Sequence, residues 1–342
     1  HTNYYFSITP EYLEGGLDRF AQFFIAPLFN ENYVTRERAI VDSEYQARRD
    51  DEGRRLWTAR KVLYNPEHPV TQFSVGSLDT LADRDNDPVR EDLVAFYKRY
   101  YHASRMALSV IGNQSLDQLQ AWVKEKFSAI PGDGEDYAPF VQQLVPDDKL
   151  PIQLTLKPIK DTRSVTFSFP VESLQADMDS KPGQYLSNLL GHEGEGSLLA
   201  TLKERAWANG LSAGVGYSDD VQATFDIKIS LSELGLENVD EIGKLVFSEI
   251  ELIRKQGVRK DYFEEQKKLA DIDFRFQEKS SETGLVQGVA SRLHRYPAQQ
   301  VLSLPYRFKR YAPDRIEAIL KRLNPDNLQL IIVDPGLDSA QK

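Results

Sequence analysis

Cysteine is absent from the 342 residues, which excludes disulfide bonds, thiolate nucleophiles and cysteine-ligated zinc. No apolar run approaches the roughly 20 residues that a membrane-spanning helix needs, so we expect no membrane span. Positively charged residues are also fewer than negatively charged ones: 42 Lys and Arg against 52 Asp and Glu give a net charge of −10. An acidic protein repels phosphate backbones, and we therefore expect no nucleic-acid partner.

The length suits about two domains of roughly 150 residues each. A polar stretch from Ile130 to Asp136 is rich in turn-forming residues and is the best linker candidate. We therefore predict one domain over residues 1–138 and a second over residues 139–342. The chain opens at His1 with strand-like sequence rather than with Met or a signal peptide. For this reason we expect it to be a piece of a longer protein.

Helical and strand-like patterns follow the same order in both parts of the chain, and a weak internal repeat relates them at an offset of about 222 to 224 residues. In the first part we predict strands at 2–9 and 106–111, and helices at 9–25, 35–64, 89–101 and 115–127. In the second part we predict strands at 153–157, 164–169, 224–231 and 328–333, and helices at 182–190, 197–207, 236–256, 259–277, 281–294 and 313–323. The pattern predicts an α+β fold of two structurally repeated domains, each a mainly antiparallel sheet with helices packed on one face.

Glu37 and Glu44 are the most informative residues of the first part. Seven helical residues return to within about 20° of their start, so both carboxylates share the stripe of Ile40 and Val41. Carboxylates on a buried stripe need a positive partner, which a divalent metal or metal-bound imidazoles would supply. The alternative is a solvated face, on which Glu44 pairs with an arginine one turn later. Periodicity alone leaves both interpretations open.

Other motifs carry less information. The five histidines are never three to five residues apart, and neither His-x-x-Glu-His nor His-Glu-x-x-His occurs. Gly191 and Glu193 lie in a glycine-rich run that suits either a peptide- or anion-binding loop or a plain turn between helices. Trp57 is more typical of a core position than of a ligand pocket. Arg60 and Lys61 are interleaved with acids, a pattern that indicates a solvated helix face.

Long runs recur in one order along nearly the whole chain: His1-Thr2-Asn3-Tyr4-Tyr5-Phe6, Val41-Asp42-Ser43-Glu44, Asn65-Pro66 with His68-Pro69, and Gly191-His192-Glu193-Gly194. These runs resemble the pitrilysin/insulin-degrading-enzyme (insulinase) family of inverted-motif zinc metallopeptidases. The resemblance implies a zinc metalloendopeptidase that hydrolyses peptides or unfolded polypeptides in an enclosed chamber. Zinc lowers the pKa of its bound water, which then attacks the peptide carbonyl.

The resemblance also implies roles for the two glutamates. By motif position Glu44 is the glutamate ligand of Zn²⁺, and Glu37 is the second acid, which orients the site without binding the metal. The family's two histidine ligands and its glutamate base come from a His-x-x-Glu-His helix, which we expect upstream of residue 1. The chain thus resembles an incomplete amino-terminal half of such an enzyme. We expect weak or no zinc binding, and no peptidase activity, from the chain alone.

For the second domain the resemblance implies a substrate-holding role. The matching positions are Gly191 and Glu193, together with Leu211, Ser212 and Ala213 on a strand edge that could pair with a peptide main chain. Glu193 could then meet the free ammonium group of the peptide. The family usually has glycine where Ala213 stands, so a close backbone approach at this position is an open question.

The remaining expectations concern partners and location. Trp57 stands where the family carries an aromatic residue, which makes it a candidate for the substrate pocket. The implied partners are peptide substrates and either the carboxy-terminal half of the same enzyme or a partner subunit, and oligomers are compatible with this. Bacterial relatives of this type are often periplasmic, so we predict the periplasm, with the cytoplasm as the alternative. A second hypothesis is a non-catalytic relative that serves as a peptide-binding or assembly subunit.

Overall fold

The computed structural model describes residues 2–84, 88–132, 134 and 140–338. The chain forms two compact units, each made of separate stretches. Unit 1 comprises His1–Ala47, Val75–Pro139 and Phe276–Pro305, and unit 2 comprises Arg48–Ser74, Phe140–Arg275 and Tyr306–Lys342. Compared with a single division after residue 138, Arg48–Ser74 belongs to unit 2 and Phe276–Pro305 belongs to unit 1. The predicted domain boundary stays a prediction.

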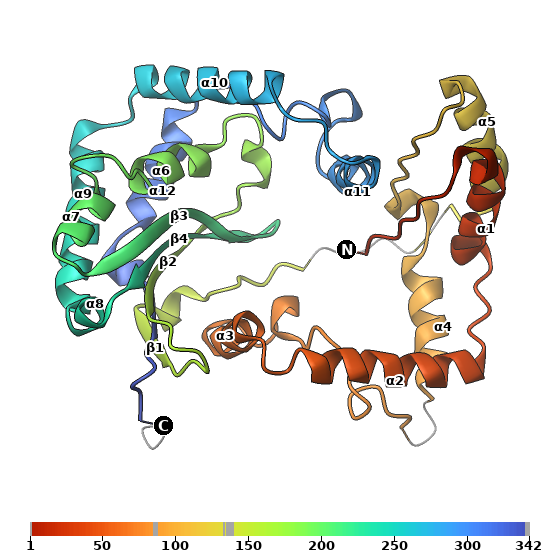
Figure 1. Ribbon diagram of the computed structural model, residues 1–342, viewed down its shortest axis with the longest axis horizontal. Helices are drawn as coiled ribbons and strands as arrows, with labels where there is room; N and C mark the ends of the chain where they lie inside the picture. The colour runs from red at the N-terminus through yellow and green to blue at the C-terminus, as the bar shows by residue number, and fades with distance from the viewer. Residues whose placement is uncertain (1, 85–87, 133, 135–139, 339–342) are drawn as a thin grey trace. The chain divides into compact units, whose positions relative to one another are not determined.

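Unit 2 is built around a five-stranded mixed sheet with the strand order β1-β5-β2-β4-β3 (Figure 1). The strands are β1 (Ile152–Leu156), β2 (Ser164–Glu172), β3 (Ala208–Ser218), β4 (Gln222–Leu231) and β5 (Gln329–Val333). β1 runs parallel to β5, whereas the other neighbouring strands are antiparallel. β3 consequently forms one edge of the sheet, with β4 as its neighbour.

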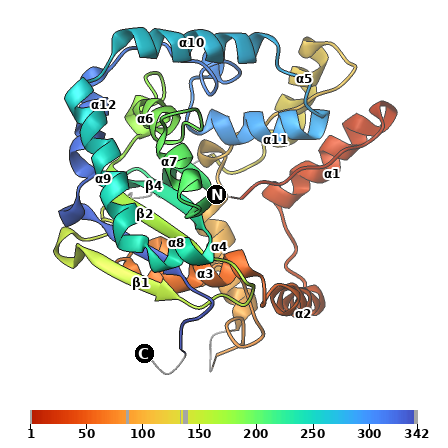
Figure 2. The ribbon, with the colours of Figure 1, turned by 60° about the vertical axis from the view of Figure 1, so that its left-hand side comes forward.

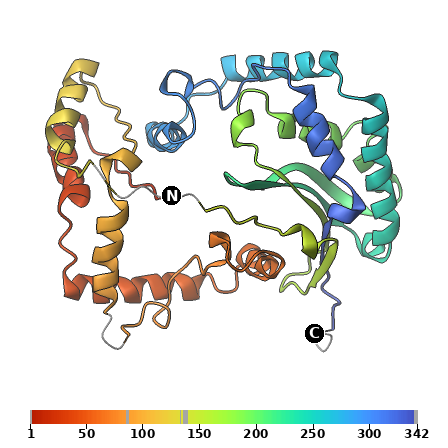
Figure 3. The same ribbon diagram turned by 180° about the vertical axis from the view of Figure 1, so that it is seen from behind.

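One face of this sheet is apolar and covered by helices. Strand residues alternate between faces, and the buried alternate residues of β2 and β4 form the core with the helices. The helices on this face are α6 (Pro182–Leu190), α7 (Leu198–Glu204), α9 (Val239–Gln256) and α12 (Pro313–Arg322), as Figure 2 and Figure 3 show. In α9, the buried residues recur at three- and four-residue steps, as expected for a helix with one face on the core: Ile242, Val246, Ile250 and Ile253.

On β2 and β4 the other face of the sheet is polar, whereas β1 and Ile331 of β5 contribute to a second, smaller apolar cluster there. β2 and β4 place Ser168, Asp226 and Lys228 on it, and helix α3 (Glu52–Arg60) contacts it through Arg60. Two more helices complete the regular structure of unit 2, namely α8 (Glu233–Glu237) and α10 (Lys260–Arg275). The sheet thus has a large apolar core on one face and, on the other, a smaller apolar cluster beside the polar residues that α3 contacts.

Unit 1 is largely helical in its described residues. Its helices are α1 (Leu13–Ile25), α2 (Glu31–Ala47), α4 (Val89–Tyr100), α5 (Leu116–Phe127) and α11 (Glu282–Leu293). Helix α5 begins at the predicted place because the Ser115 hydroxyl accepts a hydrogen bond from the amide of Gln118. The buried core of this unit is small and consists of Leu13, Leu17 and Leu119.

The predicted strands at 2–9 and 106–111 are wrong, although the α+β class is confirmed by the sheet of unit 2. Both segments lack regular strand structure in the part of the chain that the structure describes, and no backbone ladder joins them there. A strand is defined by hydrogen bonds to a neighbour, so an alternating apolar pattern alone does not produce one. Unit 1 accordingly shows no sheet over its described residues.

The predicted helix at 35–64 is also wrong as a single element. It divides into α2 and α3, because the Asp51 side chain accepts a hydrogen bond from the amide of Arg54 and caps a new helix. Most other predicted helices, and the strands near 153, 164, 224 and 328, are confirmed within a few residues. The residue pattern did not indicate β3, although the family resemblance placed Leu211, Ser212 and Ala213 on a strand edge. Over the described residues, no helix combines the length and apolar character that crossing a membrane requires.

Candidate functional site

Gly191 brings the end of helix α6 against the edge strand β3. It is the C-cap of α6, and a Cβ atom here would lie 2.7 Å from the carbonyl oxygen of Ser187 and 3.7 Å from the amide nitrogen of Ala213. Glycine is therefore required for this close approach. The loop that follows leaves Glu193 exposed, without a hydrogen bond or ion pair to any described residue. Its carboxylate is free to meet a positive group.

The edge strand presents its residues to two faces. Leu211 is buried against the core, whereas Ser212 is exposed and Ala213 half-buried. In the register with β4, Ser212 lies opposite Lys228. Because β3 has a neighbour on one side of the sheet order, alternate amide and carbonyl groups point toward its open edge. Those groups can pair with an extended peptide.

A cavity of about 490 Å³ lies between helix α3 and the polar face of the sheet. We call it the α3 pocket. It brings together three of the residues predicted to bind substrate, namely Trp57, Ser212 and Ala213. Trp57 stacks edge-on against Tyr64, with ring centroids 6.0 Å apart. Of the other predicted residues, Leu211 belongs to the core, whereas Gly191 approaches β3 next to Ala213.

Arg60 fixes helix α3 to the sheet, a role that the sequence did not indicate. Its Nη1 atom lies 3.2 Å from Oδ2 of Asp226, and its Nη2 atom donates to the Ser168 hydroxyl at 2.7 Å. Ser168 in turn donates to Oδ1 of Asp226 at 2.6 Å. The interpretation of Arg60 as part of a solvated face is therefore wrong. A mostly buried ion pair, closed by a hydroxyl, holds this wall of the α3 pocket.

Burial and neighbouring charges also shift the pKa values of Arg60 and Tyr64. Burial alone would lower the pKa of the Arg60 guanidinium, but Asp226 and Tyr64 raise it above its ordinary value. Burial raises the pKa of the Tyr64 phenol to about 12. Arg60 therefore remains charged, and Tyr64 neutral, throughout the physiological pH range.

Glu37 and Glu44 share a face of helix α2, as their spacing predicts. Of the two interpretations that periodicity left open, the described residues match the solvated face, because α2 has no buried residue and both glutamates are exposed. The half-buried side of α2 faces the segment after residue 75, where Asp42 accepts a hydrogen bond from the amide of Leu78 and Arg38 pairs with Asp83 at 2.9 Å. The glutamates lie to one side of this packed stripe.

The described residues do not by themselves form a zinc centre. Among them, no group of three or more His, Cys, Asp or Glu side chains is placed to hold a metal ion. A structural or catalytic zinc site needs at least three protein ligands. Glu44 is thus a single carboxylate available on a helix surface, and we derive no chemical step through zinc from these residues.

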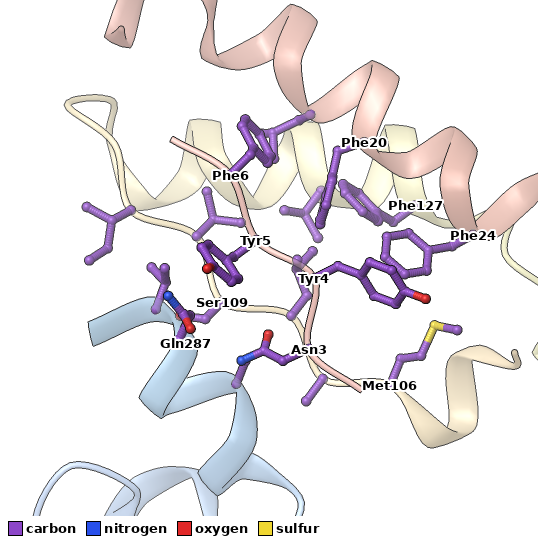
Figure 4. A pocket seen from close by; sticks show the side chains of 18 of the residues that line it. Asn3, Tyr4, Tyr5, Phe6, Phe20, Phe24, Met106, Ser109, Phe127 and Gln287 are labelled. Carbon is purple, nitrogen blue, oxygen red and sulfur yellow. The ribbon is translucent and has the colours of Figure 1, made fainter. Parts of the chain in front are cut away.

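Unit 1 contains an apolar cavity of about 780 Å³. Figure 4 shows the aromatic rings that gather in it, from helices α1 and α5 and the segment around Phe6. The Phe6 and Phe20 rings lie 4.9 Å apart between centroids, and Phe20 and Phe24 lie 5.2 Å apart. None of the site residues predicted from the sequence lines this cavity. It is bordered by the two extended segments that were predicted as strands.

Comparison with known proteins places these features in a family. Three family models match the chain: Insulinase (Peptidase family M16) over residues 1–61, the Peptidase M16 inactive domain over 88–269, and the middle or third domain of peptidase M16 over 274–342. Together they define a chain assembled from peptidase-type domains. The chain belongs to the insulinase family, peptidase family M16.

Individual relatives agree with this. The chain is 37% identical over 347 residues to insulin-degrading enzyme from Drosophila melanogaster, covering 99% of this chain and 35% of that protein. A relative from Schizosaccharomyces pombe, whose name includes the words zinc protease, is 34% identical over 351 residues, covering 100% of this chain and 36% of that protein. The crystal structure of pitrilysin superposes with a TM-score of 0.91 at 27% identity, covering 96% of this chain and 35% of that one. The chain therefore spans about a third of the length of the curated relatives it matches.

The Arg60–Asp226 pair yields a stability prediction. Replacing Asp226 with Ala leaves the Arg60 charge largely buried without a carboxylate, which we expect to lower the free energy of unfolding by about 2 to 3 kcal/mol. The double variant Arg60→Met/Asp226→Leu removes both charges and should recover most of this loss. Urea denaturation measures the free energy of unfolding of the parent protein, the single variant and the double variant.

The control for this stability comparison is Glu241→Ala, which breaks an exposed ion pair with Lys244 on α9. We expect its effect to stay below about 1 kcal/mol. An Asp226→Ala variant as stable as the parent protein would show that the pair does not hold α3 on the sheet.

Proposed function

We propose that this chain is part of a zinc metalloendopeptidase that hydrolyses peptides or unfolded polypeptides in an enclosed chamber. In this proposal unit 2 holds the substrate, and Glu44 supplies one carboxylate ligand to Zn²⁺. The remaining ligands and the base come from the family's His-x-x-Glu-His helix, a motif that is absent from these 342 residues. The chain alone is then inactive and needs the carboxy-terminal half of the same enzyme or a partner subunit.

The observation that carries the substrate-holding role is the open edge of β3 beside Gly191. Glycine lets the end of α6 approach the amide of Ala213, so a peptide that pairs with β3 begins next to the loop of Glu193. Main-chain pairing does not depend on the side chains of the peptide, so it allows an enzyme to bind many different unfolded peptides. The exposed Glu193 carboxylate then binds the free amino terminus as an ion pair. Trp57 contributes apolar contact area in the adjacent pocket.

A second candidate function is a non-catalytic family member that binds peptides or serves in assembly. It is favoured by the match of residues 88–269 to the Peptidase M16 inactive domain. Glu44 favours the catalytic alternative, because it occupies the position of the metal-binding glutamate in the motif of the family that the chain resembles. For the compartment we retain the periplasm, with the cytoplasm as the alternative.

Binding of the peptide amino terminus can be tested with one peptide in two forms. Fluorescence anisotropy should show that the chain binds a peptide with a free amino terminus about threefold to fivefold more tightly than the acetylated form, because an ion pair is lost on acetylation. Glu193→Gln should abolish this difference. Glu195→Gln, which removes an exposed carboxylate two residues away, should retain it. If the Glu193→Gln protein still discriminates between the two peptides, Glu193 does not hold the amino terminus.

The metal role of Glu44 is testable in the whole protein. We expect Glu44→Gln to weaken Zn²⁺ binding by more than 100-fold, since it removes a direct ligand, and Glu37→Gln to weaken it by about 10- to 100-fold. Glu31→Gln, a matched change at the exposed start of the same helix, should leave Zn²⁺ affinity unchanged. Competition with a chelating dye measures the affinities. Equal Zn²⁺ affinity in the Glu44→Gln and parent proteins would remove Glu44 from the ligand set.

A further inference from the structure

Lys228 is a charged residue that the proposed function does not use. It is exposed on β4, and its side chain forms no hydrogen bond or ion pair with any residue that the structure describes. Asp226, two residues earlier on the same face, is already satisfied by Arg60 and Ser168. The charged residues that line the α3 pocket are Arg60, Lys228 and Asp226, which leaves one net positive charge. A positive pocket in a chain with a charge balance of −10 attracts an acidic group.

The edge strand leaves space for a side chain to reach this charge. Ser212, Gly214 and Gly216 line the α3 pocket along β3, so no large side chain from these positions obstructs it. Gly216 must stay small, because a Cβ atom here would overlap the Asp226 carboxylate. In the register, Ser212 lies opposite Lys228 and Gly214 lies opposite Asp226. The path from the open edge of the sheet to Lys228 thus passes over small residues.

The distances allow contact with a peptide on β3. Neighbouring strands lie about 4.7 to 4.9 Å apart, so a peptide strand added to β3 lies about 10 Å from β4. An extended lysine side chain spans about 6 Å, and a glutamate side chain about 4 to 5 Å. Their charged ends therefore meet above Ser212. A glutamine of the same length reaches this place but carries no charge.

We propose that the α3 pocket is a specificity subsite, in which Lys228 selects an acidic side chain near the amino terminus of a peptide that pairs with β3. This inference rests on the proposed substrate-holding function and adds a preference that main-chain pairing cannot supply. Ser212, opposite Lys228, is adjacent to Ala213, which Gly191 approaches. The selected residue is therefore among the first three of the peptide. The occupant is an extended acidic peptide.

The test compares two peptides of identical length with free amino termini, one with Glu at the second and third positions and one with Gln there. Fluorescence anisotropy with the full 342-residue chain measures both dissociation constants. We expect the Glu peptide to bind about threefold to fivefold more tightly at low ionic strength, and the preference to shrink in high salt. Lys228→Gln should abolish the preference, and Lys228→Glu should reverse it. Lys268→Gln, an exposed lysine on α10, is the matched control and should retain it.

The outcomes separate this subsite from the function on which it rests. Equal binding of the Glu and Gln peptides, or an unchanged preference in Lys228→Gln, contradicts the subsite while peptide binding itself stands. Failure of both peptides to bind contradicts the substrate-holding function and the subsite together. Loss of the preference in Lys228→Gln with unchanged affinity for the Gln peptide supports the subsite, since a merely structural defect would weaken both peptides alike.

Discussion

The ion pair between Arg60 and Asp226 is the interaction on which the candidate site depends. It joins a helix to a strand that lies 166 residues later in the chain, on the face of the sheet where a smaller apolar cluster, which includes Trp57 and Ile331, packs beside it. Charges that lose most of their water are costly unless their hydrogen bonds are satisfied. Ser168 satisfies the second carboxylate oxygen. The pair fixes the Arg60 end of α3, and Trp57 packs nearby in the smaller apolar cluster that borders the α3 pocket.

The two faces of the sheet in unit 2 serve different purposes. On one face, apolar strand residues and four helices form the buried core, which fixes the strands and their register. On the other face, the buried Ser168 hydroxyl and the mostly buried Arg60–Asp226 pair lie beside α3, whereas Ser212 and Lys228 are exposed. The edge strand β3 belongs to both, since Leu211 anchors it in the core while Ser212 faces outward. Because β3 is anchored in the core and has an unpaired edge, an extended peptide can bind along it as an added strand.

Local signals in the sequence predicted much of the fold. Serine caps at positions 115, 197 and 281 start helices where expected, because capping involves residues three apart in the chain. The residue pattern did not indicate β3, which only the family resemblance suggested, because the glycines of β3 lower strand propensity; packing by α6 and pairing with β4 compensate for them. Within the described residues, the segments at 2–9 and 106–111 have strand-like patterns without a ladder, so pairing cannot be predicted from alternation alone.

The candidate site was predictable only in part, for similar reasons. The shared face of Glu37 and Glu44 follows from helical spacing, but their exposure depends on what packs against α2, which spacing does not reveal. The family resemblance indicated Trp57 as a pocket candidate and, separately, Ser212 and Ala213 as strand-edge positions, and it did not predict that all three line the α3 pocket. Arg60 could not be identified as a structural residue, because its partners Ser168 and Asp226 lie far away in the chain.

The central claim is that a peptide joins the sheet as a sixth strand along β3. Hydrogen–deuterium exchange of the chain, with and without a saturating peptide that has a free amino terminus, tests this most directly. Strand addition predicts slower exchange at alternate amides between residues 211 and 215, with little change on the outer face of α9. Peptide binding without any protection of β3, or with protection confined to unit 1, would contradict the account.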